Sequence, residues 1–313
     1  MVTTLSPTPR TATARRRPTP WLTQRRRRQL AGLALVSPAL LVVGIFFLIP
    51  LVMTFWMSLH DWPLLGEHRW VGLDNYTRAL HDRNWLDSVM FTLKYTVFIT
   101  PLLFVSGLAL AVLVNRPGRP ARVFQTVFFL PVVIGFAAAA YLWLYLAQPG
   151  IGPLSDLSVH AGLGTRESNW FSTSAGALVV VVLMVVWKVT GMQMILLLSG
   201  LQAIPAEITE AARIDGAGPW KSFVHIVLPL LRPTLALVLV FSVAGSLLAF
   251  DQFFIMTAGG PSNSTITAVY QIYRTSFINF DLGYGAALSA QLMIVLGAVS
   301  AVQMLLLRKT DFS

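Results

Sequence analysis

The side chains that most often carry enzymatic chemistry are scattered in this sequence. The five histidines form no HExxH pattern or other spacing that brings ligands to one metal ion, and no GxSxG motif offers a serine nucleophile. The absence of cysteine excludes thiolate ligands and disulfides. The segment Gly216–Ser222, GAGPWKS, resembles a phosphate-binding loop, but Trp220 replaces the glycine before the lysine and no strand precedes it. We therefore expect no catalytic site, no metal, no cofactor and no ATP hydrolysis by this chain alone.

A few charged and polar side chains interrupt otherwise apolar segments, where they could contact a hydrophilic solute. An ammonium group in hydrocarbon costs at least about 2.5–3.5 kcal/mol on insertion scales, so Lys188 should face protein, water or solute. Asp251 is the only acid within such a segment. An aromatic face can cover the C–H side of a sugar ring while amides and carboxylates bind its hydroxyls. The residues of this predicted solute path are Tyr141, Trp187, Lys188, Gln193, Asp251 and Gln252.

A structural interpretation of the same residues stays open beside the solute path. Lys188 could pair with a neighbouring carboxylate or a helix carbonyl instead of a solute. Each aromatic side chain could equally pack as an ordinary membrane residue.

One polar stretch, residues 207–233, lies between two strongly apolar segments and predicts two short helices. Pro205 suits a first helical turn, and Glu207 and Glu210 lie near the positive end of the helix that follows. Gly216 ends this helix because glycine adopts the backbone angles of a helix exit, and Pro219 opens the second helix. The residues at helical spacing on the narrow face of the first helix are Ile208, Ala211, Ala212 and Ile214.

The composition requires that lipid surround most of the chain. Of the 313 residues 55% are hydrophobic and 12% are charged, and the mean hydropathy is +0.68. A helix needs about 20 apolar residues to cross a bilayer. Six windows of this kind predict an all-α membrane protein with six transmembrane helices: residues 31–58, 89–114, 123–147, 175–200, 233–257 and 286–307. Pro38, Pro101 and Pro131 lie within or near these windows and predict kinked helices that still span the membrane.

Loop charges predict how the helices are oriented. With the N-terminus inside, 16 basic residues fall on the inner side and 5 on the outer side, while 4 acidic residues fall inside and 8 outside. The positive-inside rule then places both termini and the stretch 207–233 in the cytoplasm. Residues 1–29 predict a disordered basic tail. Beside an apolar segment such a tail is typically an anchor to anionic membrane lipid, so we expect no nucleic-acid partner.

The polar stretch resembles the EAA loop in the membrane subunits of bacterial ABC importers. The residues that carry the resemblance are Glu210, Ala211, Ala212, Gly216, Ile226, Leu228 and Pro229. Other segments look like the carbohydrate-type branch of these permeases, which serves maltose, glycerol-3-phosphate or trehalose uptake. They are residues 71–76, 128–131, 200–205, 215–217, 250–251 and 257–261. The resemblance implies a type I importer (MetI-like) permease fold of six helices over residues 30–313, with a coupling loop at residues 201–232.

The same resemblance implies a set of partners and a mechanism. The partners are a second homologous permease subunit, a dimer of cytoplasmic ATP-binding subunits, and an extracytoplasmic solute-binding protein or lipoprotein, all at the bacterial cell membrane. The loop helix would enter a groove of the ATPase, whose closure on ATP would move the spanning helices. The residues expected to couple to the ATPase are Glu207, Glu210, Ala211, Ala212, Asp215, Gly216, Ile226, Leu228 and Pro229.

Two other classes of function compete with an importer subunit. A self-contained secondary transporter would need inverted repeats and several ion-coupling carboxylates at mid-membrane, but Asp251 is alone. An integral membrane transferase would show a cluster of acidic residues or histidines at a membrane face, and the sequence has no such cluster. A permease subunit for a carbohydrate or polyol phosphate is therefore the leading interpretation.

Overall fold

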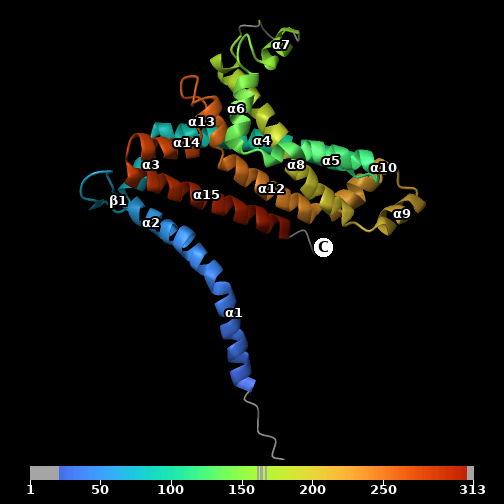
Figure 1. The fold of residues 1–313 in the computed structure, drawn as a ribbon, viewed down its shortest axis with the longest axis horizontal. Coiled ribbons are helices and arrows are strands. Elements are labelled where there is room, and N and C mark those ends of the chain that lie inside the picture. The colour runs from blue at the N-terminus through green and yellow to red at the C-terminus, as the bar shows by residue number, and fades with distance from the viewer. Residues whose placement is uncertain (1–20, 161, 163–164, 166–167, 309–313) are drawn as a thin grey trace, which may run out of the picture. The chain divides into compact units, whose positions relative to one another are not determined.

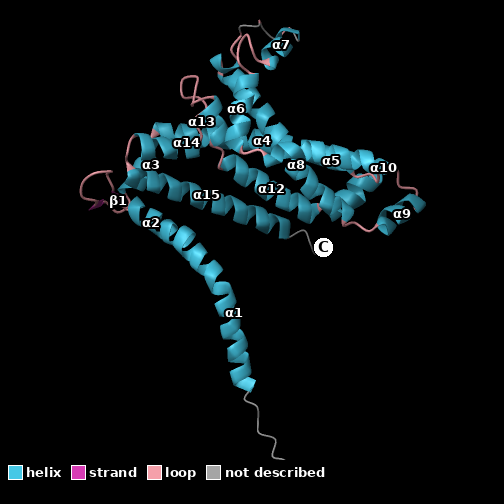
Figure 2. Ribbon diagram, in the orientation of Figure 1, coloured by secondary structure: helices cyan, strands magenta, loops and turns pink. Residues whose placement is uncertain are grey.

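The computed structural model describes residues 21–160, 162, 165 and 168–308. The chain divides into two units, residues 1–53 and 54–313. Figure 2 shows that the described elements are helices apart from one short two-stranded sheet, in which β1 (His60–Asp61) pairs antiparallel with β2 (Arg69–Trp70). An all-helical membrane fold agrees with the sequence, because a helix satisfies its backbone hydrogen bonds within one segment.

The first unit is helical over its described residues. Helix α1 (Trp21–Val43) continues through a π-helical turn, Gly44–Leu48, into α2 (Ile49–Ser58), and residues 28–58 are long and apolar enough to span a membrane. Residues 21–29 are therefore helical, where the sequence predicts a disordered tail, and residues 1–20 lie outside the described residues. Arginine has a high helix propensity, so a helix begun in the apolar run extends into the basic residues before it.

In the second unit the long helices lie side by side (Figure 1). The second, fourth and sixth predicted spans are each a single helix: α4 (Arg83–Val114), α8 (Ser174–Gln202) and α15 (Leu282–Arg308). The fifth predicted span is divided into α12 (Arg232–Leu247) and α13 (Asp251–Met256). In the described residues five helices are long enough to cross a membrane, or six if one bent pair counts as a span.

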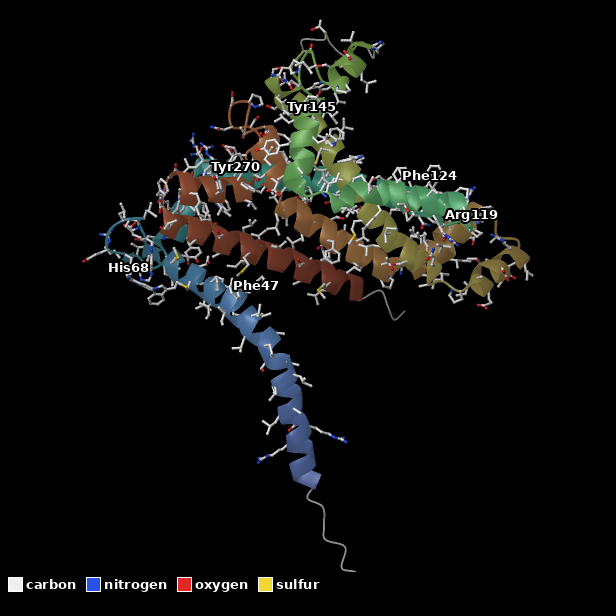
Figure 3. The ribbon with its side chains drawn as sticks, viewed as in Figure 1. Phe47, His68, Arg119, Phe124, Tyr145 and Tyr270 are labelled. Atoms are coloured by element: carbon white, nitrogen blue, oxygen red, sulfur yellow. The ribbon has the colours of Figure 1, made fainter. Side chains whose placement is uncertain are left out.

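That bent pair occupies the third predicted window, residues 123–147, in which the sequence predicts one spanning helix with a kink at Pro131. Helix α5 (Arg119–Val133) and α6 (Phe136–Leu146) meet at an angle of 99°. Figure 3 labels Arg119 at the start of α5 and Tyr145 near the end of α6, and shows how the bend directs α6 away from the line of α5. Proline is often found at sharp kinks, and Pro131 lies just before this one.

Short elements connect the spans. They are α3 (Asp74–Ala79), α7 (Pro153–His160), a 3-10 turn at Trp170–Ser172, α9 (Ala206–Ile214), α10 (Pro219–Ser222), a π-helical turn at Phe223–Val227, α11 (Leu228–Leu230), α14 (Ala268–Tyr273) and a π-helical turn at Arg274–Ile278. Side chains define where two of the long helices begin. The Asp82 carboxylate accepts a hydrogen bond from the backbone N–H of Asn84 (3.0 Å) at the start of α4, and Thr173 caps α8 in the same way.

Small residues let the long helices approach closely, as is usual in membrane bundles. A Cβ atom at Gly191 of α8 would collide with the carbonyl oxygen of Phe128 on α5. A Cβ atom at Gly200 would lie 2.7 Å from Leu231 Cδ1 and would also meet Thr234 at the start of α12. A second tie between α8 and α12 is the hydrogen bond from Gln193 Nε2 to Ser242 Oγ, at 2.7 Å. The Gly200 contact and the Gln193–Ser242 hydrogen bond thus join α8 to α12.

Candidate functional site: the coupling loop and the membrane cavity

The predicted coupling loop is present as a helical segment between α8 and α12. Figure 1 shows α9 and α10 at one end of the long helices, opposite to the end that carries α3 and β1. Pro205 precedes α9 as its N-cap, and Glu207 lies in the first turn. The carboxylates of Glu207 and Glu210 are both exposed; Glu207 lies near the positive end of the helix dipole, and Glu210 lies in the middle of the helix.

The exit of α9 has the hydrogen bonds of a Schellman motif. The N–H of Ala217 donates to the carbonyl of Ala212 (2.9 Å), and the N–H of Gly216 donates to the carbonyl of Arg213 (3.1 Å). Gly216 has φ +79°, a left-handed backbone conformation that strains any residue with a Cβ atom. The predicted role of Gly216 as a helix stop therefore has a direct geometric basis in the structure.

The second half of the loop passes without a long break into a spanning helix. Pro219 is the first residue of α10, as the sequence predicts, and α10, the π-helical turn and α11 lead to Leu231 and then to α12. Ile226, Leu228 and Pro229 are half-buried in this part of the loop. The loop is therefore joined to the start of α12 by a nearly continuous helical segment.

Apolar side chains near the tip of the loop are exposed within this chain. Ile214, at the end of α9, is 87% exposed, and Trp220 in α10 is 75% exposed. Ala211 and Asp215 are exposed as well, whereas Ala212 is buried inside the chain at 6% exposure. Exposed aliphatic and aromatic groups flanked by carboxylates are typical of a protein interface, in which the apolar groups occupy the centre and the charged groups the rim.

A cavity of about 180 Å³ lies inside the helical bundle. Helices α4, α6, α8, α12 and α13 all contribute to its wall. The lining residues are Tyr95, Ile99, Leu103, Phe136, Val185, Val189, Phe241, Ser242, Gly245, Ser246 and Gln252. Four of these, Tyr95, Ser242, Ser246 and Gln252, bring hydroxyl or amide groups into an otherwise apolar lining, which is the usual composition of a site for a small ligand.

Lys188 contacts the end of the broken helix α5. Its Nζ donates to the carbonyl oxygens of Pro131 and Val132, both at 3.3 Å, and lies 4.8 Å from the centroid of the Phe136 ring. The lysine is only 5% exposed. The last carbonyls of a helix attract cations, and Lys188 binds two of them here: the Val132 carbonyl, and the Pro131 carbonyl, which also accepts from the N–H of Ile134 at 3.3 Å. Of the two interpretations that the sequence leaves open, the structure shows the helix-carbonyl pairing.

The structure brings together only some of the predicted path residues. Gln252 lines the cavity, Gln193 donates to its Ser242, and Lys188 lies behind its Phe136. Asp251 precedes Gln252 and is half-buried at the start of α13. Two predicted residues lie elsewhere. Tyr141 lines a separate pocket of about 430 Å³ with Tyr145, and Trp187 packs against Trp143 at 6.0 Å between ring centroids.

Several cavity residues escaped the sequence analysis. Ser242 and Ser246 stand four residues apart in an apolar helix, so they share one face, and this spacing was a usable signal. Tyr95 and Phe136 carried no such signal, because each is an aromatic residue in an apolar run.

A polar pocket of about 530 Å³ lies at the opposite end of the long helices from the coupling loop. Arg78 Nη1 pairs with Asp281 Oδ2 at 2.7 Å, and the Arg78 guanidinium lies 3.9 Å from the centroid of the Tyr284 ring. The Tyr284 hydroxyl donates to Asp82 Oδ2 at 2.8 Å. These contacts join α3 and the start of α4 to the start of α15.

A test of Lys188 follows from the magnitudes involved. In Lys188→Met, the Val132 carbonyl loses a donor at about 1–3 kcal/mol and the Pro131 carbonyl keeps the Ile134 N–H, while the cost of burying the ammonium, about 2.5–3.5 kcal/mol, is removed. These terms nearly cancel, so we expect the thermal midpoint of the purified complex to change by only a few degrees. Uptake should nevertheless fall several-fold, because the bend between α5 and α6 loses the hydrogen bonds from Lys188 that fix it. The exposed Arg119, at the far end of α5 from the bend, gives the matched control Arg119→Met, which should change neither quantity. Unchanged uptake in Lys188→Met would contradict the assignment.

Comparisons with known proteins agree with this architecture. A family model described as the binding-protein-dependent transport system inner membrane component matches residues 78–310. The chain is 36% identical over 273 residues to the sn-glycerol-3-phosphate transport system permease protein UgpA of Escherichia coli O157:H7, covering 86% of this chain and 91% of the relative. It is 33% identical over 260 residues to a probable ABC transporter permease protein of Pyrococcus horikoshii, covering 82% and 89%.

Solved structures show the same fold. A chain of a bacterial ABC transporter involved in the import of the acidic polysaccharide alginate superposes with a TM-score of 0.81 at 19% identity, covering 93% of this chain and 99% of that chain. A chain of the MetNI methionine ABC transporter superposes with a TM-score of 0.51 at 18% identity, covering 76% and 99%. These likenesses support the predicted type I importer permease fold.

Proposed function

We propose, on the premise that this chain belongs to the family of inner membrane components of binding-protein-dependent transport systems, that it forms half of an import path for a carbohydrate or a polyol phosphate. The chain is a permease subunit of an ABC importer and a multi-pass membrane protein. Such a subunit works with a second permease subunit, an ATPase and a solute-binding protein. The proposal concerns its solute class, its orientation and the residues that couple it to the ATPase.

The connection between the loop and the cavity is the observation that carries the proposal. Helix α9 presents exposed carboxylates and apolar side chains, and the loop continues through Leu231 into α12. Helix α12 then supplies Phe241, Ser242, Gly245 and Ser246 to the cavity wall. A rigid helix thus joins the surface that meets the ATPase to the space that would hold the solute, so that closure of the ATPase on ATP alters the cavity.

The solute class follows from the lining and from the relatives. The cavity offers hydroxyl and amide groups beside aromatic rings, a combination suited to a compound with many hydroxyls. UgpA is named for sn-glycerol-3-phosphate, and the alginate transporter for an acidic polysaccharide. Both names support a hydroxyl-rich solute for this chain.

Orientation follows from the loop charges. With α9 and α10 in the cytoplasm, the polar pocket around Arg78 and Asp281 faces outward, where a solute-binding protein can dock. The loop carboxylates then face the ATPase, which supplies the hydrolytic site that this chain is not expected to have.

Reconstitution tests the proposal directly. The chain is assembled in vesicles with its partner permease, its ATPase and its binding protein, and ATP hydrolysis is measured with maltose, with sn-glycerol-3-phosphate and with an alginate oligosaccharide. We expect one of these solutes to stimulate hydrolysis only when the binding protein is present. Uphill transport by the purified chain without the ATPase would overturn the proposal, and so would hydrolysis that none of the three changes.

A further inference from the structure

Two spaces lie one above the other along the bundle, and one side chain belongs to both walls. Besides the cavity already described, a more open pocket of about 420 Å³ is lined by Phe91, Lys94, Tyr95, Phe98, Ser174, Ala175, Leu178, Ser264 and Thr265. We call these spaces the inner cavity and the outer pocket. Tyr95 is the residue common to both linings.

The order of the two spaces is the same on two helices. On α4 the outer pocket is lined by side chains between residues 91 and 98, and the inner cavity by side chains between residues 95 and 103. On α8 the outer pocket ends at Leu178 and the inner cavity begins at Val185, which at 1.5 Å per residue is about 10 Å further along the helix. Because α8 runs from its N-terminal end toward the coupling loop, the outer pocket is the one further from that loop.

Tyr95 is held between these spaces by packing. Its side chain is 3% exposed, and its ring meets the ring of Phe253 edge to face at 5.0 Å and 88°. Phe91 contacts the same Phe253 ring at 5.3 Å. Two rings of α4 thus close on one ring of α13, and edge-to-face pairs of this kind are favourable beyond their buried area.

The partner ring lies on a short helix that a break in the fifth span separates from α12. The fifth span is broken at Leu248–Phe250, and Phe253 lies on the short helix α13 beyond the break. The loop after α13 is held against it, because Thr265 Oγ1 lies within hydrogen-bond distance of both Thr257 Oγ1 (2.8 Å) and the Gly260 carbonyl oxygen (2.7 Å). Ser264 and Thr265 of this loop form part of the outer pocket. A shift of α13 would therefore withdraw Phe253 from Tyr95 and reshape the outer pocket together.

From this geometry we propose that Tyr95 is the outer gate of the solute path, closing the inner cavity against the outer pocket while Phe253 supports its ring. The inference rests on the orientation proposed above. It assigns to Tyr95 a barrier function that depends on the size of the ring, since the packing with Phe253 is aromatic and the ring fills the space between the two linings. The hydroxyl is not required for the barrier.

The absence of cysteine from this chain makes the gate directly testable. Ser246→Cys places a thiol in the inner cavity and Ser264→Cys places one in the outer pocket, each in the Tyr95, Tyr95→Phe and Tyr95→Ala backgrounds. The full complex is kept in right-side-out vesicles and treated with a small membrane-impermeant methanethiosulfonate reagent. The rate of labelling is read on this chain after it has been separated from its partners.

We expect Ser264→Cys to react rapidly in all three backgrounds. Ser246→Cys should react slowly with Tyr95 or Tyr95→Phe and at least about tenfold faster with Tyr95→Ala. Leu103→Ala is the matched control, because it enlarges the inner cavity from the same helix without opening the barrier, and it should leave the Ser246→Cys rate unchanged.

The outcomes separate the gate from the function on which it rests. If Ser264→Cys reacts but the Ser246→Cys rate ignores Tyr95→Ala, the gate is overturned and the import function stands. If Leu103→Ala accelerates labelling as much as Tyr95→Ala, the barrier is general packing and the role of Tyr95 is overturned. If Ser264→Cys is unreactive from outside, the orientation itself is overturned.

Discussion

Uptake by the assembled importer is expected to be abolished by Glu210→Lys, while the subunit still inserts in the membrane. Glu210 is an exposed carboxylate on α9, and we expect it to meet a basic side chain of the ATPase. Reversing its charge places two cations together at a desolvated interface, which costs several kcal/mol and so weakens docking by more than tenfold. The measurements are solute uptake and the amount of ATPase that co-purifies with the tagged subunit.

A matched charge reversal makes the result specific. Glu67 is also an exposed glutamate, but it lies in the loop between β1 and β2, far along the chain from α9. Glu67→Lys should leave co-purification of the ATPase unchanged. Undiminished uptake in Glu210→Lys would remove the docking role assigned to Glu210.

Gly216→Pro should cause a comparable loss through geometry alone. Proline fixes φ near −65°, whereas Gly216 has φ +79°, and proline also lacks the N–H that Gly216 donates to the carbonyl of Arg213. The exit of α9 must then rearrange, so the exposed face of the helix no longer meets the ATPase in register. We expect solute-stimulated ATP hydrolysis in the reconstituted complex to fall to the unstimulated rate.

Two alanine variants test how strongly solute-stimulated ATP hydrolysis depends on the backbone conformation at Gly216. Gly216→Ala keeps the N–H but strains the left-handed conformation by about 1 kcal/mol, so we expect partial stimulation. Gly218 has φ −65°, which alanine adopts freely, and Gly218→Ala should retain full stimulation. Equal activity in Gly216→Pro and Gly218→Ala would show that the Schellman turn does not matter for coupling.

Local signals predicted much of this molecule. Five of the six predicted windows coincide with helices of spanning length, because hydropathy over about 20 residues is a property of the segment itself. The coupling helix was predictable for the same reason. Pro205, the carboxylates and Gly216 specify its start and its end within a dozen residues.

The bend between α5 and α6 could not be predicted in the same way. Pro131 permits a kink, but the side chains that stabilise the bend are distant in sequence. Lys188, which donates to the Pro131 carbonyl, lies 57 residues away along the chain. The bend also requires a glycine at position 191 of α8, because a Cβ atom there would collide with the α5 backbone at Phe128. Beyond the bend, Phe136 at the start of α6 lies in the same cavity wall as Gln252, whereas Tyr141, five residues further along α6, lines a different pocket.

The close contact of Gly200 with α12 and the bond from Gln193 to Ser242 have a consequence for how solute preference can change during evolution. In the proposed function α8 and α12 move with the coupling loop, so substitutions on their facing sides would separate ATP hydrolysis from transport. Helix α4 packs against the same contact, because a Cβ atom at its Gly107 would lie 2.8 Å from Gln193 Cβ. The part of the cavity wall that α6 contributes, through Phe136, lies outside these facing sides. A lineage could therefore adopt a new nutrient by altering that position while coupling to the ATPase is preserved.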